Sequence, residues 1–355
     1  MIQAQENKSN LLVGTYTNSC ESKGIYVYEF DTVTGDFKFK NASEPVINPS
    51  YLAISTKNDF VYSVSENDQK GSCVVAFNYQ QEDGKLTVLN KSDSKSGGSC
   101  YVINDENNVI TANYGSGSIS VFGKNKDGSL TEVKQLIQHT GKSINPKRQD
   151  KPHAHMVYFS PDKKYVLATD LGTDKVSVYE YHPNEKTEVL KLYNEVSVPA
   201  GGGPRHLIFI KNGKQVYVLN ELDGSLVAFK YKNGQLIKFF ETSILPKDYM
   251  GKIQSADIHI SPDGQFLYAT NRGETGEITT FKLLKSGKLE WVEQISTLGK
   301  GPRNFVIDPT GNFLLVAHQY SNTIVIFKRD KTTGKLTDTG KKIELCSPVC
   351  LVFGE

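Results

Sequence analysis

The chain has 355 residues, and its 41 lysines and arginines nearly balance its 39 aspartates and glutamates, which gives a formal net charge of +2. This balance, without a basic cluster, excludes the usual electrostatic signature of nucleic-acid binding, and no apolar stretch is long enough to cross a membrane. Neither nucleic acid nor a membrane is therefore expected as a partner, and the composition identifies no protein partner.

The first ten residues are polar and precede the first patterned segment. We expect residues 1–10 to form a disordered leader and residues 11–355 to form a single domain, although a chain of this length often holds two. The leader contains no apolar signal-peptide core, so a cytoplasmic location is expected. A periplasmic location would require a signal peptide that has been removed.

From Leu11 onward, short apolar segments alternate with turns in a unit of about 40–50 residues, a period typical of propellers and solenoids. Segments such as 119–122 and 176–179 alternate apolar and polar side chains, as half-buried strands do. No stretch keeps the period of about 3.6 residues that marks a long helix. Four antiparallel strands per unit predict the blade of a β-propeller.

Two kinds of turn separate the strands, and both are rich in Pro, Asp, Asn and Gly, which favour tight turns. The first kind follows the first strand of a unit and lies at residues 56–59, 105–108, 160–163, 211–214, 261–264 and 308–311. The second kind follows the third strand and lies at residues 83–86, 127–130, 233–236, 286–289 and 333–336. The regular order of the two kinds supports one repeated architecture along the whole chain.

Counting the innermost strands gives the number of blades. These strands begin near Pro49, Gly98, Pro152, Pro204, Ser255, Pro302 and Pro348. The chain starts inside a unit, because residues 11–14 match a second strand, and it ends on residues 347–353, which match a first strand. The predicted fold is therefore all-β: a seven-bladed β-propeller with four antiparallel strands per blade, whose ring is closed by the C-terminal strand, so that no blade edge stays open.

The five cysteines, at positions 20, 73, 100, 346 and 350, show neither the spacing of a metal site nor a disulfide framework. For Cys346 and Cys350, which flank the closing strand, we expect small buried side chains. No cofactor is expected.

Candidate functional residues gather on one face of the disk. Because strand direction alternates within a blade, the connection into each first strand and the loop after each second strand lie on the same face, at the mouth of the central channel. Three of the five arginines fall on these connections. The candidate catalytic and substrate-binding residues on these connections and beside them are His153, His155, Arg205, His206, Asn220, Glu221, Asn271, Arg272, Arg303, Asn304, His318 and Gln319.

Arginine side chains bind planar oxyanions with two parallel hydrogen bonds, so this mouth predicts a small anionic substrate, with a carboxylate or a histidine as general base. The same residues could instead be structural: the arginines could bond carbonyls of neighbouring blades, and Glu221 could simply pair with an arginine. The long connections 134–150 and 240–254 are either lids over the mouth or surface insertions.

The histidines also allow two interpretations. His153 and His155 lie on the same side of a strand, which could suit a metal ion, but no third ligand accompanies them. We therefore expect no metal site. His206 directly follows Arg205 and could face the mouth or pack inside its blade.

Several of these segments carry a family resemblance, which covers residues 11–353. They are Leu12-Val13-Gly14-Thr15-Tyr16-Thr17, His153-Ala154-His155, Gly203-Pro204-Arg205-His206, Asn220-Glu221-Leu222, Asn271-Arg272 and Gly301-Pro302-Arg303-Asn304-Phe305. The chain resembles the seven-bladed lactonase family that includes the bacterial propeller-type 6-phosphogluconolactonase and the fungal carboxy-muconate lactonizing enzyme.

The resemblance implies hydrolysis of a sugar lactone without a metal, foremost 6-phospho-D-glucono-1,5-lactone to 6-phosphogluconate in the pentose phosphate pathway. It also implies that His153 or His155, Arg205, Glu221 and Arg272 are active-site groups. Two alternatives stay open: a carboxy-muconate-type cyclase, and a non-catalytic propeller that binds a partner on this face.

Overall fold

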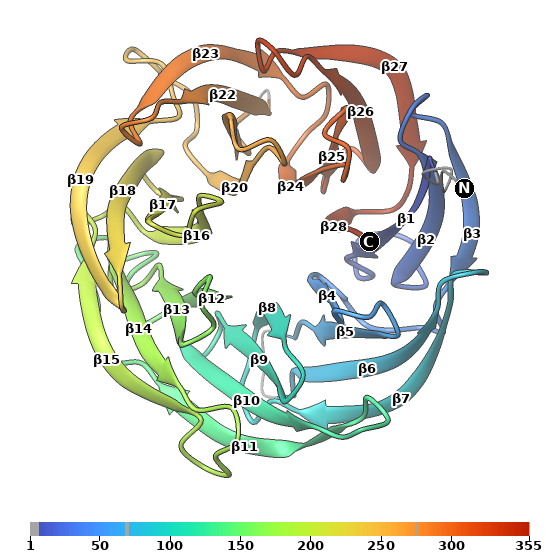
Figure 1. Cartoon of the computed structure of the whole chain (residues 1–355), viewed down its shortest axis with the longest axis vertical. Helices are drawn as coiled ribbons and strands as arrows, with labels where there is room; N and C mark the ends of the chain where they lie inside the picture. The colour runs from blue at the N-terminus through green and yellow to red at the C-terminus, as the bar shows by residue number, and fades with distance from the viewer. Residues whose placement is uncertain (1–6, 68–70, 275, 355) are drawn as a thin grey trace, which may run out of the picture.

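The computed structural model describes residues 7–67, 71–274 and 276–354. Over these residues it contains 28 strands in seven four-stranded antiparallel sheets, which stand around a central channel as the blades of a ring (Figure 1). This arrangement confirms the predicted seven-bladed propeller. Within the part of the chain that the structure describes, no helix has the length and apolar character needed to span a bilayer.

Each blade contributes one strand to each of four concentric layers. The innermost strands are β28 (Pro348–Phe353), β4 (Leu52–Ile54), β8 (Ser99–Asn104), β12 (Ala154–Phe159), β16 (Pro204–Phe209), β20 (Ser255–Ile260) and β24 (Pro302–Ile307). The second strands are β1 (Lys8–Thr15), β5 (Phe60–Ser65), β9 (Asn108–Asn113), β13 (Tyr165–Asp170), β17 (Gln215–Asn220), β21 (Phe266–Asn271) and β25 (Phe313–His318).

The two outer layers complete the blades. The third strands are β2 (Ile25–Asp31), β6 (Cys73–Gln80), β10 (Ser118–Lys124), β14 (Lys175–Tyr181), β18 (Ser225–Lys232), β22 (Glu277–Leu283) and β26 (Thr323–Arg329). The outermost strands are β3 (Phe37–Ala42), β7 (Lys85–Asp93), β11 (Leu130–Gln138), β15 (Leu190–Ser197), β19 (Gln235–Ser243), β23 (Leu289–Ser296) and β27 (Leu336–Glu344).

Burial explains the sequence pattern of the layers. The second strands are covered on both faces by the neighbouring blades and are apolar on both faces. All six residues of β25, for example, are buried. In the outermost strand β11, by contrast, exposed residues are interspersed with less exposed ones. The core therefore consists of apolar layers between blades. Three buried tyrosines also link neighbouring blades by hydrogen bonds. Each donates from its hydroxyl to the carbonyl of a turn glycine in the next blade: Tyr62 to Gly128, Tyr217 to Gly287 and Tyr268 to Gly334.

The ring closes as predicted. The C-terminal strand β28 pairs antiparallel with β1, with Leu11 opposite Phe353 and Gly14 opposite Cys350, and both ends of the described chain lie in this blade (Figure 1). Residues 1–6 of the expected leader lie outside the described residues. Residues 8–10, which were assigned to that leader, are the first residues of β1, so the patterned chain begins earlier than the sequence indicated.

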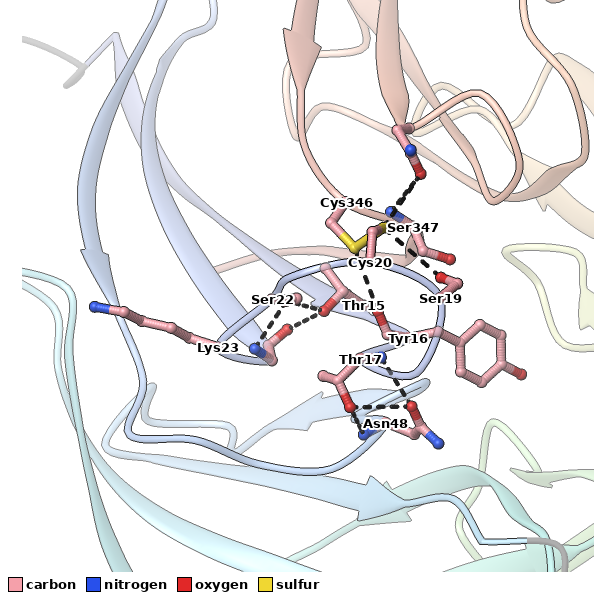
Figure 2. The surroundings of a disulfide bond; sticks show 12 residues. Thr15, Tyr16, Thr17, Ser19, Cys20, Ser22, Lys23, Asn48, Cys346 and Ser347 are labelled. Carbon is pink, nitrogen blue, oxygen red and sulfur yellow. Dashed lines mark hydrogen bonds between the residues drawn. A yellow bond between two sulfur atoms is a disulfide. The ribbon is translucent and has the colours of Figure 1, made fainter.

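A disulfide between Cys20 and Cys346 crosses the closure (Figure 2). It joins the loop after β1 to the segment that enters β28, and 326 positions separate the two cysteines in the sequence. The expectation that the chain holds no disulfide was therefore wrong, as was the expectation of a free buried thiol at Cys346. Cys350 is a free buried cysteine, as expected. Only the folded ring brings positions 20 and 346 together.

We expect the double substitution Cys20→Ser, Cys346→Ser to lower the melting temperature without changing the fold. A cross-link that closes a long loop typically contributes about 2–4 kcal/mol by restricting the unfolded chain. Thermal denaturation by circular dichroism measures the effect, and Cys73→Ser, which removes a free, half-buried thiol, is the control. Equal melting temperatures of the double variant and the oxidised wild type would contradict a stabilising role.

Candidate active site

Local irregularities at the start of the innermost strands aim side chains at the channel mouth. The pairing of first and second strands shifts register between Ser99 and Tyr101, between Ala154 and Met156, between Pro204 and His206, and between Pro302 and Asn304. A bulge turns the extra residue away from the ladder. The residues at the four shifts are Cys100, His155, Arg205 and Arg303, and all four line one narrow cavity beneath the mouth.

A second set of side chains comes from the residue that follows each second strand. These seven equivalent residues are Tyr16, Glu66, Tyr114, Leu171, Glu221, Arg272 and Gln319. The set contains three polar residues that are not among the candidates named from the sequence, Tyr16, Glu66 and Tyr114. Their equivalence to Glu221 and Arg272 within the repeat is the signal that could have identified them.

Glu221 is the centre of a buried ion-pair cluster. Its side chain is 3% exposed, and its carboxylate contacts Arg148 at 2.6 Å, Arg272 at 2.8 Å and Arg205 at 3.5 Å. Burial alone would raise the pKa of this carboxyl, but the three guanidinium groups hold it at about 2. Glu221 is therefore ionised at neutral pH and fixes arginines from three separate segments around itself.

Arg148 was not expected in the mouth. It lies in the long connection between β11 and β12, and it also donates to the hydroxyl of Tyr114 at 3.2 Å. Gln149 beside it is fully buried and donates to the carbonyl of Leu171 and to the carboxylate of Asp174. This connection is thus fastened to the blade and supplies a cation to the mouth. Only its unusual length hinted at such a role.

The two histidines of the His-Ala-His motif have different surroundings. His155 is buried, and its ring accepts a hydrogen bond from Nη1 of Arg205. Burial and the charge of Arg205 lower the pKa of His155 well below its ordinary value, so the ring is neutral. His153 lies at the rim, where it stacks on Tyr114 with ring centroids 4.3 Å apart and donates from Nδ1 to the Tyr114 carbonyl at 2.9 Å.

In the described ranges 7–67, 71–274 and 276–354, no group of three or more His, Cys, Asp and Glu side chains is placed to hold a metal ion.

The opposite side of the mouth holds a second carboxylate. Glu66 accepts hydrogen bonds from the hydroxyl of Tyr16, at 2.9 Å, and from the hydroxyl of Ser50. The guanidinium group of Arg303 lies over the Tyr16 ring, 5.3 Å from its centroid. Among the described residues, Arg303 makes no ion pair with a carboxylate closer than 4.0 Å, in contrast to Arg148, Arg205 and Arg272.

Three of the expected substrate-binding residues make hydrogen-bond contacts with neighbouring protein groups. Asn220, Asn271 and His318 each end a second strand and are at most 1% exposed. Asn220 donates to Ser225 at 2.7 Å, and Asn271 donates to the Tyr249 hydroxyl at 3.0 Å, while Nδ1 of His318 lies 3.4 Å from the hydroxyl of Thr323.

The remaining expected residues lie at or beneath the mouth. Gln319 is half-buried at the rim position of its blade. His206 and Asn304 lie deeper and line the narrow cavity together with Arg205 and Arg303. Asn271 also fastens the second long connection, because it bonds both Tyr249 and the carbonyl of Lys252 within it.

Comparisons with known proteins agree with this geometry. The family model described as "Lactonase, 7-bladed beta-propeller" matches residues 10–353. A 6-phosphogluconolactonase from Bacillus subtilis is 38% identical over 351 residues, which are 96% of this chain and 97% of the relative. A 6-phosphogluconolactonase from Formosa agariphila is 36% identical and covers 92% of this chain and 94% of its own.

Comparison with solved structures also finds lactonase-like propellers. The crystal structure of a putative 6-phosphogluconolactonase from Bacteroides fragilis superimposes with a TM-score of 0.95 at 40% identity and covers 99% of each chain. The periplasmic gluconolactonase of Pseudomonas aeruginosa gives a TM-score of 0.92 at 34% identity, over 98% of this chain and 99% of its own. Since the family model and these relatives each cover nearly the whole chain, this protein belongs to the seven-bladed β-propeller lactonase family.

Proposed function

We propose that this protein is a lactonase that hydrolyses a sugar lactone to the open-chain acid at the channel mouth. The observation that carries the proposal is that Arg205 and Arg303 line one narrow cavity with His155 and His206, while Arg148 and Arg272 join Arg205 around Glu221. Water adds to the ring carbonyl, negative charge develops on the carbonyl oxygen, and the ring C–O bond then breaks. Fixed cations beside that oxygen stabilise the transition state.

The geometry suggests different roles in the reaction for the individual candidate residues. Arg205, buried beside His155, is placed to stabilise the developing oxyanion, and Arg272 and Arg148 add positive charge around it. Glu221 orients these three arginines, because a carboxylate whose pKa is about 2 is a poor proton acceptor at neutral pH. His153 would contact the substrate at the rim. A neutral histidine nearer the cavity takes the proton from water.

Arg303 is the side chain that we propose to bind the charged group of the substrate. The cluster around Glu221 already pairs three guanidinium groups with one carboxylate, whereas Arg303 has an aromatic ring beneath it and no ion-pair partner within 4.0 Å in the described residues. A guanidinium group supported in this way can bind phosphate through two parallel hydrogen bonds. This favours 6-phospho-D-glucono-1,5-lactone as the substrate, in keeping with the names of the Bacillus and Formosa relatives.

Unphosphorylated gluconolactone is the second candidate, since the Pseudomonas relative is named a gluconolactonase. The two substrates are separated by an assay with freshly generated 6-phosphogluconolactone, coupled to a dehydrogenase specific for 6-phosphogluconate, and by a pH-indicator assay with gluconolactone. A no-enzyme control is essential, because both lactones open spontaneously. Failure to accelerate either reaction would overturn the proposed function.

We expect Arg303→Gln to raise KM for 6-phosphogluconolactone by about 10- to 100-fold, because a hydrogen bond to a charged group contributes about 1.5–3 kcal/mol. KM for gluconolactone should change little. Lys300→Gln, which removes an exposed cation from a neighbouring connection, is the control. An equal effect of Arg303→Gln on both lactones would exclude binding of the phosphate by this residue.

The disulfide is evidence on the cellular compartment in which the protein works. Disulfides persist in oxidising compartments and are rare in the reducing cytoplasm. The Cys20–Cys346 bond and the periplasmic Pseudomonas relative together favour an oxidising compartment such as the periplasm over the cytoplasm that the sequence indicated. Alkylation of free thiols in cells, before lysis, tests this: labelling of both Cys20 and Cys346 would place the protein in a reducing compartment.

A further inference from the structure

A buried carboxylate lies directly beneath the proposed active site. Asp257, on β20, is 2% exposed, and its two oxygens together accept five hydrogen bonds. The donors are Nδ1 of His206 at 2.8 Å, the backbone amide of Ile258 at 2.9 Å, Nδ2 of Asn304 at 2.5 Å, Nε2 of His259 at 3.0 Å and the backbone amide of Phe305 at 3.2 Å. Such saturation fixes the carboxylate in one orientation and keeps it ionised.

The bond to Asp257 settles the tautomer of His206. An ionised carboxylate can only accept, so Nδ1 of His206 must carry the proton, and Nε2 then holds the lone pair in the neutral ring. Within the described residues Nε2 has no hydrogen-bond partner in the protein, and the ring lines the narrow cavity with Arg205 and Arg303. The cavity has room for about one water molecule.

The surroundings keep this ring neutral. Burial and the charge of Arg205 lower the pKa of His206 to about 4, although Asp257 opposes the shift. At neutral pH the ring is therefore a proton acceptor. The adjacent carboxylate would stabilise the imidazolium that forms when the ring takes a proton, as in other Asp–His pairs.

The other candidate bases are less suitably placed. The ring of His155 already accepts a hydrogen bond from Arg205, so its lone pair is occupied. His153 lies at the rim, stacked on Tyr114, and is absent from the residues that line the cavity. Glu221 is saturated by three guanidinium groups.

We infer that His206 is the general base that activates water in this enzyme, and that Asp257 is the residue that positions it. The inference rests on the proposed lactone hydrolysis. A water molecule in the cavity gives one proton to Nε2 of His206 while its oxygen bonds to the lactone carbonyl carbon. The carbonyl π electrons move to the oxygen beside Arg205. When the tetrahedral intermediate collapses, the carbonyl C=O bond re-forms and the ring C–O bond breaks. The leaving ring oxygen takes the proton from His206, which returns the histidine to its neutral state.

The test compares three variants with matched geometry. His206→Gln replaces the imidazole with an amide that cannot take a proton, and we expect kcat on the hydrolysed lactone to fall by about 10²- to 10⁴-fold with KM nearly unchanged. Asp257→Asn should lower kcat in the same direction. His182→Gln is the control, because His182 lies just after β14, outside the cavity, and its side chain is 46% exposed. We expect it to retain wild-type kcat.

The pH profile separates a base from a structural residue. His206 is surrounded by Arg205 on its own strand and by His155, Asp257, His259, Tyr51, Tyr101 and Arg303 on the neighbouring elements. His206 is expected to lose base function as the pH falls toward about 4. The wild-type kcat should therefore fall below about pH 5, and this acid limb should be absent from the residual rate of His206→Gln.

The outcomes are distinct. Lactone hydrolysis by the wild type with full kcat in folded His206→Gln would overturn this inference and leave the proposed function standing. Absence of lactone hydrolysis in the wild type would overturn both. If Asp257→Asn fails to fold, as judged by circular dichroism, His206→Gln alone decides the assignment, because it leaves Asp257 and its four other hydrogen-bond donors in place. An unchanged acid limb in His206→Gln would also exclude His206 as the base.

Discussion

Deleting residues 347–355 should abolish the cooperative unfolding transition of the native protein. The deletion removes β28, whose Val349, Cys350 and Leu351 are at most 4% exposed, and with it the partner of β1. Burial of an aliphatic side chain contributes about 1.5–3 kcal/mol, so the loss is comparable to the total stability of a domain, about 5–15 kcal/mol. The open edges of the first blade would favour aggregation.

Circular dichroism and analytical size exclusion measure this result. Removal of residues 354 and 355 alone is the control, since β28 ends at Phe353. An unchanged melting temperature after the longer deletion would show that the ring does not depend on its closing strand.

The second large effect is expected for Glu221→Gln, which keeps the shape of the side chain and removes its charge. The three guanidinium groups around it would lose their carboxylate, and breaking a buried ion pair on one side typically costs about 3–5 kcal/mol. The arginines would also lose the orientation that the proposed oxyanion site needs, so kcat should fall by about 10²-fold or more.

The pH dependence of stability follows from the same group. The pKa of Glu221 is about 2 in the folded protein, against an ordinary value of 4.5, so its contribution is complete above pH 4.5 and is lost as the pH falls toward 2. In Glu221→Gln this part of the acid destabilisation should be missing. Glu241→Gln, which breaks an exposed pair with Lys238, is the control and should change stability by less than about 1 kcal/mol. Full activity and stability in Glu221→Gln would exclude the proposed role of the cluster.

The fold was predictable because each blade repeats the same local signals. Turn residues recur at matching places, and the match of residues 11–14 and 347–353 to different strands of one unit identified the closure. The same repeat placed Arg205, Arg303 and Arg272 on one face. It did not show which polar residues turn inward, because a strand-end residue such as Asn271 and the residue after it have similar sequence signals but point in different directions.

The features that the sequence missed depend on contacts between distant segments. Arg148 reaches Glu221 from a long connection that has no counterpart in most blades. The bond between Cys20 and Cys346 depends on the two ends of the ring meeting, and the spacing of the five cysteines carries no sign of it. Likewise, Asp257 is one of many residues of an inner strand in the sequence, and its role beneath His206 depends on the blades of β16, β20 and β24 lying side by side.

The disulfide has a mechanical consequence. A pulling force applied at the two ends of the chain enters through β1 and β28 and meets the Cys20–Cys346 bond after only 19 residues from one end and nine from the other. The covalent bond then carries the load, and the 325 residues between the cysteines form a closed loop that the force bypasses. Stretching of the oxidised protein should therefore release a short length of chain and stop, whereas the reduced protein should unravel blade by blade.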